Sequence, residues 1–484
     1  MINKLKPKSE FYRNILIFST ATTQIFGDNL FVSIKGNDLN DCKSEKTSCK
    51  TIQKSVNLAK AGDTVYIKAG NYGNEKVTFP NSGTADRLIT LEGYKNKPGD
   101  KPMYLNPTPN MVLDPLLMPL LDGNDLLKST AFGLYGKEYI QIRHFQIKNY
   151  NKGIYSTGGS RKKPLDGIHF SYIYAREFGS TSGTFTPKSG GATTSANWGY
   201  GIALSKSHKY SSIEHCVVIN AGGDSILAYG DHNKIRDNKV FATWYDEKGL
   251  KRINNTDYDI TIRGDNNVVD NNYIKTDITL YHRGHGISIL TDENGNWTPC
   301  VAVEYDTAQY NVVTNNTVEG AGTGLQLRHD VANNFFTNNS IINTICGIGF
   351  TDGAHDNNIA KTIIRGATYM VSFVETPENG KDILFPSISD NMIDTIIAED
   401  IHHMIDLSIF APSEKYYLNI QNNIIKNLTI KNAKKLYETN KHKYKKNIIK
   451  NNQILNVKLI NVSDSSLLLG FNIVNFVQTD RANR

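Results

Sequence analysis

Short apolar strands separated by glycine and asparagine make up most of the chain from about residue 135 onward. Isoleucine and valine alternate with polar residues in these segments, and a period of two predicts β-strands with one buried face. Within them, asparagine recurs two places before a β-branched residue. The positions that follow this rule are Asn238, Asn272, Asn316, Asn339, Asn391, Asn423 and Asn452, and Cys216 holds the corresponding place one turn earlier. Such recurrence indicates a repeat architecture.

The spacing of these positions matches the coil of a parallel β-helix. Cys216 and Asn238 are 22 residues apart, Asn316 and Asn339 are 23 apart, and the step from Asn238 to Asn272 is one coil plus a loop. Stacked coils place each asparagine above the next, where the amides can hydrogen-bond in a ladder. Leucine-rich repeats have a similar period but need a leucine-dominated spacing that is missing here. We therefore predict an all-β fold, a single-stranded right-handed parallel β-helix.

The segment before the repeats predicts a cap that contains a short helix. Ile52, Val56 and Ala59 recur at helical spacing behind Thr47 and Ser48, which are candidate N-caps, and Gly62 is the expected stop. The following stretch, DTVYIKAGNY, alternates apolar and polar residues and ends in Gly-Asn, as a strand does. The whole segment resembles the entry of many secreted β-helix proteins related to pectate lyases, in which the helix covers the open end of the stack.

The N-terminus predicts export. A basic stretch precedes a short apolar run from Ile15 to Phe26, which is typical of a secretory signal, although an uncleaved disordered N-terminus is the alternative. We therefore divide the chain into a signal peptide at 1–27, a cap at 28–75 and the β-helix at 76–484. No later segment has the apolar length of a membrane span, so we expect none. The expected location is secreted or periplasmic.

Cysteine usage and charge narrow the classes of partner. Cys42 and Cys49 lie in one loop and can pair in an exported protein, whereas Cys216 and Cys346 are expected to be buried thiols, and with Cys300 their spacing matches no zinc site. The net charge is +7, with 54 basic and 47 acidic residues. This balance gives no basic stripe for nucleic acid, and a mildly basic surface suits an anionic polymer.

Aligning the coils on the asparagine ladder predicts one outward column of side chains. Ile226, Ile260, Ile287 and Leu325 then point inward, and their neighbours point to solvent. The predicted outward neighbours are Leu227, Tyr229, Thr261, Arg263, Ser288, Leu290, Gln326 and Arg328. Just before the same strands lie Asp224, Asp257, Tyr258, Asp259 and His285. Because neighbouring coils are about 4.8 Å apart, these residues predict an acid–base site beside an anion clamp.

Long insertions near these strands carry aromatic residues. They include Trp198, Tyr200, Trp244, Tyr245, Tyr281, Trp297 and Tyr305, and basic side chains are added by His282, Arg283 and His329. Loops gathered along one strip of a rigid scaffold typically build a binding cleft, and flat aromatic faces suit sugar rings. We predict substrate binding there, with the alternative that the aromatic residues only pack the loops down.

The site motifs resemble those of polygalacturonase-type glycoside hydrolases. Gly-His-Gly at 284–286 matches one motif of that family, Asp224 falls on the aspartate of another, and Asp257 falls on the first member of the Asp-Asp pair. Two departures are Tyr258 in place of the second aspartate and Gln326 in place of an arginine. The resemblance implies hydrolysis with Asp257 as acid and Asp224 as base. Asp259 would replace the missing carboxylate only if it turned toward the cleft.

The same resemblance assigns supporting roles and leaves a second chemistry open. His285 would orient a carboxylate, and Arg263 and Arg328 would hold a substrate carboxylate or sulfate. LQLRHD resembles the Arg-His segment of alginate lyases and chondroitinase B, and RGHG is similar to a motif of mannuronan epimerases. Elimination or epimerisation would use His285 or Tyr258 as base. The lysine of those lyases and the Asp-Pro-His motif of the epimerases are both absent.

We predict a secreted enzyme that cleaves an acidic, uronic or sulfated polysaccharide, with hydrolysis favoured over elimination or epimerisation. No cofactor is required, although Asp224, Asp257 and Asp259 together are compatible with calcium. The rival from another class is a noncatalytic, adhesin-like β-helix that only holds glycans. The sequence sets no oligomeric state.

Overall fold

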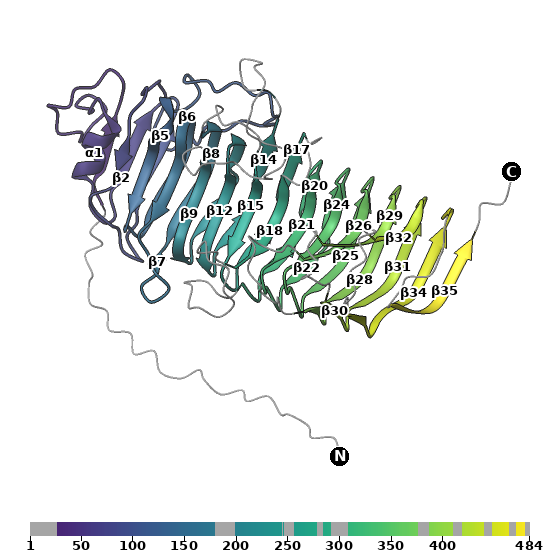
Figure 1. The fold of residues 1–484 in the computed structure, drawn as a ribbon. Coiled ribbons are helices and arrows are strands. Elements are labelled where there is room, and N and C mark those ends of the chain that lie inside the picture. Colours follow the sequence, from purple (N-terminus) through teal and green to yellow (C-terminus); the bar gives the residue numbers. More distant parts are fainter. Residues whose placement is uncertain are drawn as a thin grey trace, which may run out of the picture.

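The computed structural model describes residues 27–179, 199–243, 245, 256–277, 284–291, 308–375, 387–409, 419–439, 448–463 and 471–479. Its strands lie side by side in parallel coils, from the short helix α1 at the N-terminal end to β35 at the C-terminal end (Figure 1). The predicted parallel β-helix with a capping helix is therefore confirmed.

The N-terminal cap combines α1 with the first coils. Helix α1 spans Ile52–Leu58, and its N-cap is Thr51, whose hydroxyl accepts a hydrogen bond from the Lys54 backbone N–H. The predicted caps Thr47 and Ser48 were wrong, because the chain is still in a turn there, and the helix ends before Gly62. Ile52 and Val56 are buried, as their spacing predicted.

In the described residues, the parallel pairings of the coils follow three stacks. The first stack runs through β1 (Asn29–Val32), β2 (Thr64–Lys68), β4 (Ile89–Tyr94), β6 (Ile140–Thr157), β8 (Ile168–Phe178), β10 (Ser212–Glu214), β13 (Lys234–Arg236), β16 (Val268–Asp270), β19 (Val312–Thr314), β22 (Phe335–Thr337), β25 (Asn358–Arg365), β28 (Met392–Glu399), β31 (Ile424–Lys431), β34 (Asn452–Ile460) and β35 (Phe471–Thr479). The second stack adds β11 (Val217–Ala221), β14 (Lys239–Ala242), β17 (Tyr273–Thr276), β20 (Thr317–Glu319) and β23 (Ser340–Ile342), and then continues into the second half of β25 and its successors. These two stacks form two sides of each coil.

The third stack forms the remaining side. It runs through β3 (Val77–Thr78), β5 (Leu120–Tyr135), the end of β6, β9 (Tyr200–Lys209), β12 (Asp224–Asp231), β15 (Tyr258–Arg263), β18 (His285–Leu290), β21 (Thr323–Arg328), β24 (Cys346–Thr351), β26 (Tyr369–Glu375), β29 (His403–Ile409) and β32 (Lys435–Thr439). The short β7 (Leu165–Asp166) pairs with β9, and β27 (Ile388–Ser389), β30 (Asn419–Gln421) and β33 (Ile448–Lys450) pair with one another. The third stack carries the predicted site.

Asparagine ladders fix the turns between the first and second stacks and those that precede the first stack. In the ladder that the spacing predicted, the side-chain oxygens of Asn238, Asn272, Asn316 and Asn339 each accept the backbone N–H of the ladder residue one coil earlier, beginning at Cys216. A parallel ladder joins Ser211, Asn233, Asn267, Asn311, Asn334, Asn357, Asn391, Asn423 and Asn452 in the same way.

The assignment of Asn391, Asn423 and Asn452 to the ladder of Asn238 was therefore wrong. Both ladders place asparagine before a β-branched strand, and within a coil the two sites lie close together in sequence, as Asn233 and Asn238 do. The local motif is the same in both, so it could not tell one corner of the coil from the other. The ladder amides are buried and satisfied, and each hydrogen bond contributes about 1 kcal/mol net.

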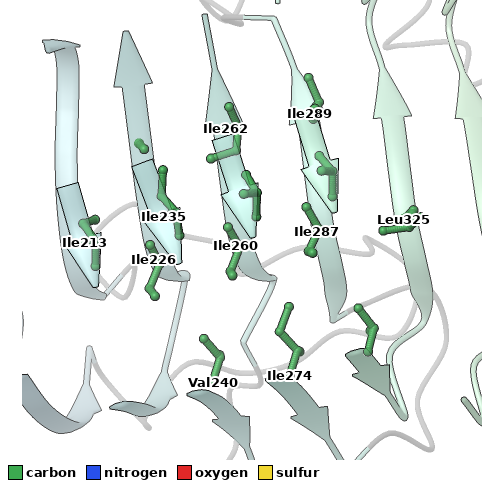
Figure 2. Close-up of a cluster of buried hydrophobic side chains, with 14 of the residues drawn as sticks. Ile213, Ile226, Ile235, Val240, Ile260, Ile262, Ile274, Ile287, Ile289 and Leu325 are labelled. Carbon is green, nitrogen blue, oxygen red and sulfur yellow. The ribbon is translucent and has the colours of Figure 1, made fainter. Parts of the chain in front are cut away.

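The core consists of apolar side chains in register from coil to coil. Ile226, Ile260, Ile287 and Leu325 lie on successive strands of the third stack, and Val240 and Ile274 of the second stack approach them across the interior (Figure 2). Each of these side chains is buried. The inward positions predicted from the ladder are confirmed.

The cysteines behave as their sequence context predicted. Cys42 and Cys49 form a disulfide, and Cys216 and Cys346 are buried free thiols. Cys300 lies outside the described residues. A helix with the length and hydropathy needed to cross a bilayer is not found in the described part of the chain.

Candidate functional site

The outer face of the third stack carries a column of polar side chains at the strand starts. Asp224 pairs in register with Tyr258, Tyr258 with His285, and His285 with Thr323. Neighbouring coils of a parallel stack are about 4.8 Å apart, so these four positions are contiguous on the surface. We call them, with the matching positions of the other coils, the outer column. The column brings Asp224 and His285 together as predicted, but with Tyr258 between them.

Each residue that follows the outer column points into the core. Ser225 and Asp259 have no exposed surface. A side chain at Gly286 would collide with Val318, and one at Gly324 would collide with Ile341, both of which are core residues. Strict alternation therefore fails at the strand start, where Asp259 and the next residue, Ile260, both lie inside.

Asp259 is thus an interior carboxyl group and does not face the cleft. It accepts a hydrogen bond of 2.8 Å from the Thr276 hydroxyl, and its other oxygen has no hydrogen-bond partner among the described residues. Burial raises the pKa of Asp259 from 3.8 to about 7. This carboxyl group cannot replace the missing aspartate of the hydrolase motif, because it lies on the other side of the strand.

A guanidinium, a phenol and an imidazole converge on the outer column. Arg328 leaves the end of β21, crosses β18 and donates a hydrogen bond of 3.3 Å from Nη1 to the Tyr258 hydroxyl. The rings of Tyr258 and His285 have centroids 5.0 Å apart and are tilted by 32°. Both side chains are half-buried, so they are shielded but remain accessible. We call Tyr258, His285 and Arg328 the central cluster.

A buried carboxylate holds Arg328 from behind. Asp352 Oδ2 lies 3.5 Å from Arg328 Nε and 3.5 Å from His329 Nδ1, and the Asp352 side chain is fully buried. His329, predicted to bind substrate, is itself buried at 6% exposure and lies against this carboxylate. The only sequence feature of Asp352 is its place before a glycine after a strand, which gives no indication of a role beside Arg328.

The predicted carboxylates lie at the edge of the central cluster. Asp224 is 5% exposed and accepts a hydrogen bond of 2.6 Å from the Thr261 hydroxyl. Asp257 is half-buried in the turn before β15, where its backbone carbonyl accepts the His285 N–H at 2.9 Å. The structure therefore places both aspartates next to the outer column, and Asp224 belongs to it.

The remaining predicted binding residues lie on the same face. The Arg263 guanidinium lies 4.7 Å from the centroid of the Tyr229 ring, and its Nη1 donates to the Thr291 carbonyl at 3.2 Å. Gln326 accepts a hydrogen bond of 3.0 Å from the Ser288 hydroxyl and is buried. Arg263 is thus a fixed cation, whereas Gln326 has a structural contact.

Several predicted residues cannot be placed. Trp198, Trp244, Tyr281, His282, Arg283, Trp297 and Tyr305 lie outside the described residues. Tyr245 is described and is 57% exposed, and its backbone carbonyl accepts from the Thr243 hydroxyl.

The acidic trio considered for calcium does not assemble, because Asp259 faces the core. Within the described ranges, no group of three or more His, Cys, Asp or Glu residues could hold a metal ion.

Sequence reasoning also missed the start of the outer column. Lys152 pairs in register with Tyr200. Ile202 pairs with Ile226 on the next coil, so Tyr200 and Asp224, each two residues before these isoleucines, hold the same position. Lys152 and Tyr200 therefore precede Asp224 in the outer column. Lys152 has no motif around it and comes before the coils on which the alignment was built.

No protein-family model and no curated protein matches this chain. Among solved structures, it is similar to a mannuronic acid specific polysaccharide family 6 lyase from human gut microbiota, with 14% identity, 89% of this chain and 88% of that chain covered, and a TM-score of 0.54. A tailspike protein of an Escherichia coli bacteriophage, in complex with a hexasaccharide, gives 9% identity, coverage of 86% and 66%, and a TM-score of 0.49. An exopolygalacturonase from Thermotoga maritima is 8% identical, with 87% of this chain and 85% of that chain covered and a TM-score of 0.43.

Of these three similarities, only the first has a TM-score above 0.5, and at 14% identity it shows the fold. The chain has a parallel β-helix fold, as its sequence predicted.

Proposed function

We propose that this protein is an exported enzyme that cleaves a uronate-containing polysaccharide by β-elimination. The observation that carries the proposal is the central cluster, in which Arg328 donates to the Tyr258 hydroxyl at 3.3 Å and the His285 ring lies 5.0 Å from that of Tyr258. The disulfide between Cys42 and Cys49 supports export, because such bonds persist in oxidising compartments. The solved structure with the same fold, a mannuronic acid specific lyase, supports the substrate class.

Elimination needs a base at C5, a cation at the carboxylate and an acid at the leaving oxygen. A guanidinium that donates to a phenol oxygen stabilises the phenolate, so Tyr258 is the base that takes the C5 proton. Arg263, held between the Tyr229 ring and the Thr291 carbonyl, is the cation for the carboxylate. His285 gives its proton to O4 as the C4–O4 bond breaks. A double bond forms between C4 and C5, and no oxidant or metal is consumed.

Hydrolysis is the second candidate. It is favoured by Asp224, a carboxylate in the outer column beside Tyr258, and by Asp257 in the preceding turn. Hydrolysis requires an acid and a carboxylate on opposite sides of the scissile bond. Asp224 already accepts a short hydrogen bond from Thr261, and Asp259 lies inside, so the described carboxylates are less well placed for two roles than the central cluster is for elimination.

A product assay on acidic polysaccharides separates the candidates. The wild-type protein is incubated with polymannuronate, polygalacturonate and chondroitin sulfate, and ultraviolet absorption and reducing ends are followed together. Elimination gives a new absorption band from the conjugated double bond in step with the chain ends, whereas hydrolysis gives chain ends alone. Epimerisation gives neither, but it exchanges the C5 proton with deuterated solvent. A glycan-binding protein without activity gives none of these signals.

Variants then test the roles of the residues. Tyr258→Phe keeps the ring beside His285 and removes only the hydroxyl that Arg328 contacts, so elimination should fall at least about a hundredfold. Thr323→Val, two places along the outer column from Tyr258, is the matched control and should retain activity. A Tyr258→Phe protein that is as active as the wild type would remove Tyr258 as the base. Loss of activity in Asp224→Asn with Tyr258→Phe unaffected would favour hydrolysis.

A further inference from the structure

Lys152 stands three coils before Tyr258 in the outer column. It pairs with Tyr200, and Tyr200 and Asp224 separate it from Tyr258 along the third stack. At about 4.8 Å a coil, Lys152 lies roughly 14 Å from the strand position of Tyr258. The lysine is therefore on the same surface as the central cluster but too far away for one sugar to touch both.

Two aromatic rings hold the Lys152 ammonium. Its Nζ lies 3.8 Å from the centroid of the Tyr155 ring and 5.6 Å from that of Tyr200, and the two rings are 5.8 Å apart. The Tyr155 hydroxyl donates to the Ser205 hydroxyl at 3.2 Å, which fixes the ring. Tyr200 is half-buried, and burial raises the pKa of its phenol, with nearby Asp224 adding to the effect, so this ring is neutral.

Lys152 differs from neighbouring lysines in the partners of its ammonium. Lys148 lies 3.5 Å from Asp122, and Lys209 lies 3.4 Å from Asp231. Lys152 is half-buried, and no ion pair of its ammonium occurs in the part of the chain that the structure describes. Cation–π contacts attract the ammonium but leave its charge uncompensated. A partly desolvated cation with no counterion is ready to bind an anion.

We propose that Lys152, on the Tyr155 and Tyr200 rings, is a distal subsite that binds an anionic group of the same polysaccharide chain. The inference rests on the proposed function, because it takes the substrate to be an acidic polymer lying along the outer column. The group is a carboxylate or a sulfate. Only an oligosaccharide several units long spans the distance from the central cluster to Lys152, so the subsite selects for chain length and for charge.

Binding of defined oligosaccharides tests the subsite directly. Calorimetry compares the wild-type protein with Lys152→Met, Lys152→Arg and the control Lys209→Met, using oligomannuronates, oligogalacturonates and chondroitin sulfate fragments from disaccharide to octasaccharide. Lys152→Met should weaken binding of the long fragments about tenfold or more, the value of a charge-assisted contact. Lys152→Arg and Lys209→Met should bind as the wild type does. Disaccharides reach only one site, so Lys152→Met should bind them as tightly as the wild type does.

The oligosaccharide series distinguishes a carboxylate ligand from a sulfate. A loss seen with uronate oligomers identifies a carboxylate, and a loss seen only with the sulfated series identifies a sulfate. Equal binding of long fragments by Lys152→Met and the wild type would overturn the subsite while leaving the proposed function intact. Length-dependent loss without any unsaturated product would overturn elimination while supporting the subsite. If the wild type binds none of these fragments, both proposals fail. Unchanged disaccharide affinity of Lys152→Met shows that its loss with long fragments is not misfolding, and unchanged affinity of Lys152→Arg shows that the subsite needs the positive charge.

Discussion

Replacing Asp259 with asparagine should stabilise the protein at alkaline pH. The carboxyl group has no exposed surface, and among the described residues its hydrogen-bond donor is the Thr276 hydroxyl at 2.8 Å. Burial raises its pKa from 3.8 to about 7, so the folded protein keeps a proton there that the unfolded chain has lost. Asparagine has almost the same shape and cannot ionise.

The sign and size of the effect follow from proton linkage. Between the unfolded pKa of 3.8 and the folded pKa of about 7, the folded state binds more protons, so the free energy of unfolding falls as the pH rises. A shift of about three pKa units corresponds to about 4 kcal/mol at 1.36 kcal/mol per unit. This loss of unfolding free energy is absent below the pKa of the unfolded chain and complete above the pKa of the folded protein. Asp259→Asn should remove it, so its advantage over the wild type grows with pH and then levels off.

Thermal unfolding of both proteins across pH measures this difference, and other titrating groups cancel in the comparison. The matched control is Asp277→Asn, which changes an exposed aspartate next to Thr276 and should show no pH-dependent difference. A difference in unfolding stability between Asp259→Asn and the wild type that is the same at every pH would refute the reasoning. So would a gap that grows as the pH falls, because it would mean that the folded state stabilises the charged carboxylate.

Other predictions concern the site and the ladders. Arg328→Lys keeps a positive charge, but a lysine cannot reach the Tyr258 hydroxyl and Asp352 together. The kcat should therefore fall on the order of a hundredfold, with little change in the melting temperature. Wild-type rates in steady-state kinetics would contradict this. Asn316→Ala leaves the buried Asn272 N–H without its acceptor and should lower the free energy of unfolding by about 2–3 kcal/mol. The control is Asn427→Gly at an exposed ladder, because Asn427 has a φ of 53° that glycine adopts without strain, and it should cost well under about 1 kcal/mol. Equal denaturation midpoints would contradict the distinction. A chelator such as EDTA should leave activity unchanged, because Asp259 faces the core and only Asp224 and Asp257 remain of the trio compatible with calcium; activity lost on chelation and restored by calcium would disprove it.

The sequence by itself determined the coil and its contents. Alternating isoleucine and valine, with asparagine at intervals of 22 and 23 residues, specify a strand pattern that only a stacked coil can bury, and Ile226, Ile260 and Ile287 lie inside as that pattern requires. Register along the third stack follows from the same repeat. For this reason the repeat alone was enough to assign Asp224, His285 and Arg328 to one face of the coil.

The tertiary structure alone decided which neighbours meet across coils and which side of a strand start is outside. Asp259 enters the core because alternation is interrupted where the strand leaves its turn, at the position where neighbouring coils have Ser225, Gly286 and Gly324. Asp352 reaches Arg328, and Lys152 joins the outer column, because stacking brings together residues separated by loops of unequal length. Local spacing fixes the period of a solenoid, but contacts between its turns depend on how the whole stack closes.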